Sequence, residues 1–120
     1  MIYHYSPKII GNEIQYVKKS IQDGWICLGP NIEKFENKIR KYLNSKYSVA
    51  VNSGTAALHL SLILSKVEYK DEVIVPSLTF ISPVNTIRYL GASPIFMDCD
   101  EYFNIDQNKT IEFIKKNTYF

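Results

Sequence analysis

The chain has 120 residues, of which 46% are hydrophobic and 22% charged, and its formal net charge is +2. This length suits one small domain or a piece of a larger one, and the composition is typical of a soluble globular protein. No apolar run approaches the ~20 residues that a membrane span needs. The lysines form no basic block interleaved with aromatic residues. These features disfavour a membrane-spanning protein and a nucleic-acid binder.

The amino-terminal residues and the cysteines indicate the compartment. No basic segment followed by a long apolar core opens the chain, so we expect no secretory signal and a cytoplasmic protein. Cys27 and Cys99 fit no metal-ligand spacing. We therefore expect reduced, structural cysteines and no metal site.

Residues 1–46 are expected to form an amino-terminal arm and two helices. Asn12 can cap the first helix with Gln15 three positions on, and Asp23-Gly24 should end it. The second helix is predicted from about Ile32 to Leu43, capped by Asn31. The loop between them, GWICLGP, combines glycines with bulky apolar residues, and we expect it to pack against other parts of the protein.

Residues 47–120 alternate predicted strands and helices. Branched apolar residues indicate strands at 49–51, 72–76 and 94–98, and helices are expected at 55–64, 81–90 and 108–116. Short connections between alternating elements favour an open parallel α/β sheet. Ligands bind off the carboxyl ends of the strands in such sheets, which places Ser53–Thr55, Ser77–Phe80 and Asp98 along one edge.

The junction Ser53-Gly54-Thr55 is suited to holding an anion. Small residues there let a phosphate approach the first turn of a helix, where unpaired N–H groups and the positive end of the helix dipole meet. The hydroxyl groups of Ser53 and Thr55 can add two donors. A phosphate-bearing ligand is therefore the first hypothesis. The alternative is that Gly54 only makes a turn and Thr55 only caps the helix.

Several segments together resemble a known family. NSGTAALHLSL, DEVIVPSLTFISPVNTI and GASPIFMDCD look like the amino-terminal third of the pyridoxal-phosphate sugar aminotransferases of the DegT/StrS family, within the aspartate-aminotransferase fold. Upstream, DGWICLGPNIEKFE is similar to that family's Gly-Trp loop and the helix after it. The resemblance spans essentially the whole chain. It implies an α/β fold, a partial three-layer parallel sheet of the cofactor-binding large domain, preceded by two helices.

The resemblance also implies roles for particular residues. Gly54 and Thr55, with Ser53 beside them, match positions that hold the phosphate of pyridoxal 5′-phosphate, and Phe80 matches the aromatic residue that stacks on its pyridine ring. Trp25 and Gly29 lie in a loop that in the family helps close the site near the subunit boundary, which implies a place near the substrate.

Other polar residues near the expected edge have less specific interpretations. His59 lies one turn after Thr55, and we expect it to be a packing or hydrogen-bonded histidine. A site role and a helix-face hydrogen bond both stay open for Asn85. Asp98 and Asp100 are interpreted as turn and capping groups. Lys66, Glu68 and Lys70 stand where relatives usually have glycines, so the preceding helix must end without an easy left-handed residue.

The family reaction moves an amino group from glutamate to the keto carbon of a nucleotide-linked sugar, as in polysaccharide or amino-sugar biosynthesis, in a homodimer. The Schiff-base lysine and the carboxylate at the pyridine nitrogen come beyond residue 120 in the family, so no catalytic residue is assigned here. Relatives with histidine in place of that lysine are sugar dehydratases, and this alternative stays open. So does a stand-alone phosphate-ligand binding or interaction module.

The resemblance has a consequence for the chain by itself. In the family, strands from later in the sequence lie between the first two strands, so the strand at 49–51 has no neighbour here. We therefore expect the 120 residues alone to be poorly ordered or aggregation-prone, to bind pyridoxal phosphate weakly if at all, and to be inactive.

Overall fold

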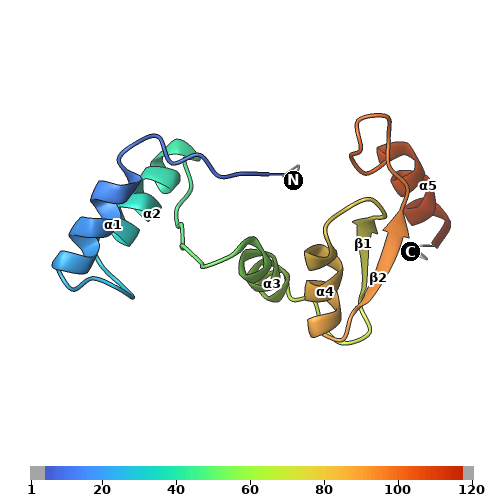
Figure 1. Cartoon of the computed structure of the whole chain (residues 1–120). Coiled ribbons are helices and arrows are strands. Elements are labelled where there is room, and N and C mark those ends of the chain that lie inside the picture. The colour runs from blue at the N-terminus through green and yellow to red at the C-terminus, as the bar shows by residue number, and fades with distance from the viewer. Residues whose placement is uncertain (1–4, 118–120) are drawn as a thin grey trace. The chain divides into compact units, whose positions relative to one another are not determined.

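The computed structural model describes residues 5–117, which form five helices and two strands. They belong to two compact units, residues 1–50 and 51–120, which are described separately. Figure 1 shows α1 and α2 in the first unit, and the other helices and both strands in the second. Residues 1–4 and 118–120, at the ends of the two expected ranges, lie outside the described residues. No helix within residues 5–117 is long and apolar enough to cross a membrane.

In the first unit, helix α1 (Glu13–Gln22) ends where the sequence predicts. Gly24 has a φ of 76°, a left-handed conformation that glycine adopts without a steric penalty. The N–H of Trp25 donates to the carbonyl of Ser20 at 2.8 Å, and that of Gly24 to the carbonyl of Ile21 at 3.1 Å. This pair of bonds is a Schellman motif, which satisfies the last carbonyls of the helix.

The predicted side-chain caps of both helices are wrong. Asn12 precedes α1 but makes no capping bond, and the Glu13 carboxylate instead accepts the N–H of Gly11 at 2.8 Å. Helix α2 (Pro30–Tyr42) begins earlier than expected, because proline has the φ that a first helical position needs and no N–H to leave unpaired. Asn31 therefore lies inside α2, where its Nδ2 donates to the Ser20 hydroxyl at 2.9 Å.

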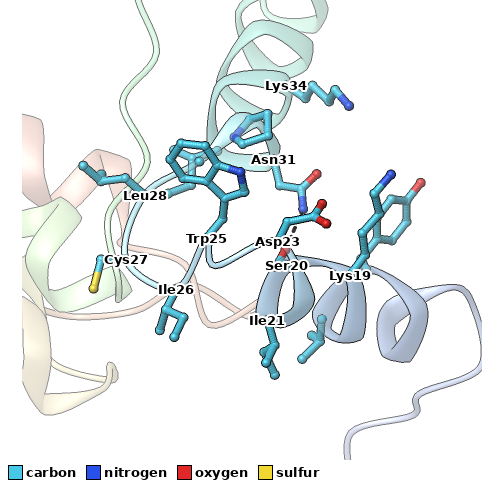
Figure 2. A pocket seen from close by; sticks show the side chains of 15 residues that line it. Lys19, Ser20, Ile21, Asp23, Trp25, Ile26, Cys27, Leu28, Asn31 and Lys34 are labelled. Carbon is cyan, nitrogen blue, oxygen red and sulfur yellow. Dashed lines mark hydrogen bonds between the residues drawn. The ribbon is translucent and has the colours of Figure 1, made fainter.

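Trp25 packs closely on the backbone at Gly29 in the loop between α1 and α2. Gly29 has a φ of 151°, and a Cβ atom added there would lie only 2.8 Å from the Cβ of Trp25. Figure 2 shows the Trp25 indole beside the start of α2, whereas Ile26 and Cys27 point away from it. The Trp25 side chain is 52% exposed, so the loop is only partly packed within its own unit.

The second unit is built on two parallel strands joined by a helix. Strands β1 (Glu72–Pro76) and β2 (Ser93–Met97) pair in parallel, with Ile74 opposite Ile95. Helix α4 (Ile81–Tyr89) connects them and packs on both, and α3 (Gly54–Leu64) packs on α4 (Figure 1). Helix α5 (Gln107–Asn117) follows β2. The buried core consists of Val75, Ile87 and Ala92, with Leu62, Val67, Val73 and Val84 packed against it.

The strand predicted at 49–51 does not form, and this expectation is wrong. Residues 49–53 have no regular structure, and Val49 is 76% exposed. A strand is stable only when its N–H and C=O groups pair with a neighbour, and β1 and β2 pair only with each other within the described residues. The branched side chains alone therefore do not produce a strand.

After α3, two lysines take left-handed conformations at positions in the segment where relatives usually have glycines. Lys66 has a φ of 60° and Lys70 a φ of 76°. The N–H of Lys66 donates to the carbonyl of Ile63 at 2.9 Å, and that of Val67 to the carbonyl of Leu62 at 3.0 Å. Helix α3 thus ends in the same Schellman motif as α1, with a lysine at a position that costs a side-chain-bearing residue about 1–2 kcal/mol.

We predict that Lys66→Gly stabilises the end of α3 by about 0.5–1 kcal/mol, because the relief of left-handed strain exceeds the added chain entropy of glycine. Amide hydrogen exchange in the natural polypeptide should slow roughly two- to fivefold at Val67, whose N–H closes the motif. Lys66→Ala is the matched control, since it removes the same side chain and keeps the strain. Equal slowing by alanine would contradict the explanation.

Gly29→Ala is predicted to displace the Trp25 ring. The added Cβ meets the Trp25 Cβ at 2.8 Å, and the backbone φ of 151° is unfavourable for alanine. Because Trp25 is the one tryptophan of the chain, its fluorescence emission should shift. Gly11→Ala is the control, because its Cβ would meet only the flexible Glu13 side chain at 3.2 Å. An unchanged emission spectrum for Gly29→Ala would show that the loop accommodates a side chain.

Candidate functional site

The start of α3 carries unpaired backbone donors. Ser53 is the residue that caps it, and its Oγ accepts the N–H of Ala56 at 3.2 Å. The N–H of Ala57 donates to the carbonyl of Ser53 at 3.1 Å, which closes the first helical turn. Within residues 5–117, the N–H groups of Gly54 and Thr55 have no protein acceptor. These two donors lie at the positive end of the helix dipole, the arrangement that favours an anion.

Gly54 leaves space beside these donors. A Cβ atom added at Gly54 would meet no atom within 4 Å, and its φ lies outside the left-handed range. Neither backbone strain nor a close neighbour within this structure requires glycine at this position. The absence of a side chain leaves the backbone open to an approaching group, so the residues present fit a phosphate at this helix start.

A hydrogen bond joins this helix start to the start of α4. The Thr55 Oγ1 donates to the Ser82 Oγ at 3.0 Å. Ser82 lies in the first turn of α4, and Phe80 is the residue immediately before that helix. The phosphate-binding candidates and the aromatic candidate therefore belong to two helix starts that are in direct contact.

Phe80 is a large apolar residue, and it is 88% exposed. Its exposed ring, immediately before the first residue of α4, is available to stack on a flat ligand. Its exposure is compatible with the ring-stacking role that the resemblance implies, and that role stays a prediction.

His59 and Asn85 lie on the two helices that carry the candidate residues. The His59 ring meets the Tyr89 ring edge to face, with centroids 5.6 Å apart and an interplanar angle of 70°. This contact between α3 and α4 agrees with a packing role for the half-buried His59. Asn85 is half-buried on α4, and its side chain makes no hydrogen bond within the described residues. The helix-face hydrogen bond is therefore not formed, and the site role of Asn85 stays a prediction.

Asp98 and Asp100 follow β2 and hold the turn that leads to α5, as predicted. The Asp100 carboxylate accepts the N–H groups of Tyr102 and Asn104, both at 2.9 Å. Asp98 accepts from Lys109 and from the N–H of Cys99, and these bonds, chiefly the one from Lys109, hold the Asp98 pKa below its ordinary value. The lowered pKa keeps the exposed Asp98 carboxylate ionised at neutral pH, in agreement with its interpretation as a turn and capping group.

Trp25 and Gly29 contribute to a cavity of about 630 Å³ in the first unit, between the end of α1 and the start of α2. Figure 2 shows its polar side, where Asn31 is hydrogen-bonded to Ser20. The structure thus brings together Trp25 with Gly29 in one unit, and Ser53, Gly54, Thr55 and Phe80 in the other. A common site for the two groups stays a prediction.

Ser82 is the functional candidate that the sequence did not indicate. Its contact with Thr55 joins residues 27 positions apart. The available signal was a hydroxyl two residues after Phe80, in the first turn of a helix at the same expected edge. This signal is weak, because serine is common in first turns for local reasons.

Comparisons with known proteins agree with the predicted family. A GDP-perosamine synthase of Escherichia coli O157:H7 is 45% identical over 97 residues, which cover 80% of this chain and 27% of that protein. The spore coat polysaccharide biosynthesis protein SpsC of Bacillus subtilis is 45% identical over 107 residues, 88% of this chain and 28% of that protein. The chain thus spans less than a third of the length of these relatives.

Solved structures give the same fold. A Streptococcus pneumoniae protein assigned as a sugar aminotransferase, solved in its PLP-form, superimposes with a TM-score of 0.80 at 34% identity, over 88% of this chain and 27% of that one. An aminotransferase of Psychrobacter cryohalolentis superimposes with a TM-score of 0.80 at 29% identity. The α/β fold is therefore that of part of a pyridoxal-phosphate sugar aminotransferase. Because the model of the DegT/DnrJ/EryC1/StrS aminotransferase family matches residues 7–120, the chain belongs to that family.

Proposed function

We propose that the chain is the amino-terminal part of an aminotransferase that uses pyridoxal 5′-phosphate to aminate a nucleotide-linked keto-sugar, with glutamate as amino donor. The observation that supports this most strongly is the contact between an open helix start, at Ser53–Thr55, and the helix start that exposes Phe80, within a chain of this family. The names of the relatives support the substrate class, since one is a GDP-perosamine synthase and another a spore coat polysaccharide biosynthesis protein.

The proposed site holds the cofactor by its phosphate and its ring. The N–H groups of Gly54 and Thr55 donate to the phosphate oxygens, and the positive end of the α3 dipole stabilises their charge. Ser53 accepts from Ala56 and keeps its hydroxyl hydrogen for the phosphate. Phe80 stacks on the flat ring and fixes its plane, at about 1 kcal/mol. When bound, the cofactor supplies the temporary carrier for the amino group.

Other parts of the proposed enzyme complete this site. The lysine and the carboxylate that pyridoxal chemistry needs are proposed to follow residue 120 in the natural polypeptide. We place Trp25 and Gly29 near the nucleotide-sugar, in a cytoplasmic homodimer. Residues 1–46 would then form the arm and two helices that precede the large domain, and residues 47–120 its first part.

The direct test incubates the natural polypeptide that contains these residues with pyridoxal phosphate, glutamate and nucleotide-linked keto-sugars, and measures product mass. An aminotransferase product contains one additional nitrogen. A product that loses a hydroxyl oxygen instead would identify a dehydratase. Binding of the cofactor with neither product would favour a binding module, and absence of cofactor binding would overturn the proposal.

Gly54→Ala is predicted to lower the affinity for pyridoxal phosphate at least tenfold, because the new methyl group occupies the space beside the two free N–H donors. The fold should persist, since the backbone conformation suits alanine. Affinity for pyridoxal, which lacks the phosphate, should change less than twofold. Ser61→Ala, on an exposed position of α3, is the control. Equal losses for both ligands would place the effect away from the phosphate.

A further inference from the structure

We propose that Ser82 is a positioning residue of the cofactor site, which sets the orientation of the Thr55 hydroxyl toward the bound phosphate. This inference rests on the proposed function. The direct evidence is the hydrogen bond of 3.0 Å between the Thr55 Oγ1 and the Ser82 Oγ. Within residues 5–117 it is the one side-chain hydrogen bond that joins α3 to α4.

Thr55 has no local partner that could hold its hydroxyl. It is the second residue of α3, so the residue four positions before it, Val51, precedes the helix and offers no helical carbonyl. Threonine has few χ1 rotamers, and a hydrogen bond selects among them. The Ser82 hydroxyl is the partner that Thr55 has, and both residues are half-buried. The orientation of Thr55 is therefore fixed from α4 and not from its own helix.

The hydrogens of the pair allow one donation to an anion. Each hydroxyl has one hydrogen and two acceptor lone pairs, so one hydrogen joins the two oxygens and one is left for a third group. In the structure Thr55 donates to Ser82. A phosphate oxygen beside Thr55 only accepts, so the pair reverses: Ser82 donates to Thr55, and Thr55 donates to the phosphate. This reversal moves no heavy atom. The hydrogen bond from Ser82 to Thr55 also polarises the Thr55 hydroxyl and so strengthens its hydrogen bond to the phosphate.

Without the Ser82 hydroxyl, Thr55 would lose the group that orients its side chain and that donates a hydrogen bond to its Oγ1. Thr55 could still donate to the phosphate, but from a rotamer that nothing selects. The expected loss in affinity for pyridoxal phosphate is therefore roughly three- to tenfold, the value of one hydrogen bond, and depends on the presence of Thr55. Affinity for pyridoxal should be unchanged.

The test is a double-mutant cycle in the natural polypeptide, with dissociation constants measured for pyridoxal phosphate and for pyridoxal. Ser82→Ala should weaken pyridoxal phosphate binding three- to tenfold in the presence of Thr55, and less than twofold in a Thr55→Val background. Ser82→Thr keeps the hydroxyl and should restore binding. Ser82→Cys keeps the side-chain volume close to that of serine but is a weak hydrogen-bond donor. It should therefore weaken pyridoxal phosphate binding as Ser82→Ala does, and it provides the test if Ser82→Ala folds poorly.

The ³¹P resonance of the bound cofactor provides a readout that a purely structural role would not change. A weaker hydrogen bond from Thr55 stabilises the phosphate dianion less, so the second phosphate pKa should rise in Ser82→Ala and return in Ser82→Thr. Additive effects in the cycle, equal losses for pyridoxal, or an unchanged phosphate pKa would overturn the positioning role. If the wild-type polypeptide binds no pyridoxal phosphate, or binds pyridoxal equally well, the proposed function itself fails.

Discussion

The candidate site depends on helix α4, which contacts both strands and α3. Ile87 of α4 is buried in the core with Val75 of β1 and Ala92, which precedes β2. At its other end α4 begins after Phe80 and carries Ser82, which accepts the hydrogen bond from Thr55. Packing of one helix against the sheet therefore sets the backbone positions of Phe80 and of Ser82, the hydrogen-bond partner of Thr55, at the same end of α4. A shift of α4 would move both relative to the start of α3.

Helix α3 is less buried than its apolar sequence predicts. Its sequence, GTAALHLSLIL, is apolar on almost every face, and such helices usually lie in the interior of a large domain. Here it packs on α4, and several of its leucine and isoleucine side chains are exposed, namely Leu58, Leu60, Ile63 and Leu64. Val49 and Val51, just before it, are exposed as well. These side chains fit the proposal that further parts of a longer enzyme cover this region.

Secondary-structure elements with local signals could be predicted from the sequence. The prediction failed where the conformation depends on a neighbouring strand or on tertiary packing. The branched residues of β1 and β2 have each other as neighbours and form the expected parallel pair, whereas those at 49–51 have no neighbouring strand within residues 5–117 and remain irregular. Glycine marked the end of α1 correctly. After α3, by contrast, hydrogen bonds to the last carbonyls and the packing of Val67 on the core hold Lys66 in a conformation its own side chain disfavours.

The candidate site shows the same difference between local signals and contacts that depend on tertiary packing. Ser53, Gly54 and Thr55 could be proposed from the sequence because an anion cradle is a local property of one helix start, and the family resemblance singled out Phe80. Ser82 could not be identified, because its partner is 27 residues away and the contact exists only once α3 lies against α4. That contact has a further physical consequence. When no ligand is bound, the half-buried hydroxyls of Thr55 and Ser82 are hydrogen-bonded to each other. The proposed site can therefore remain ordered when empty and still donate one hydrogen bond to an incoming anion.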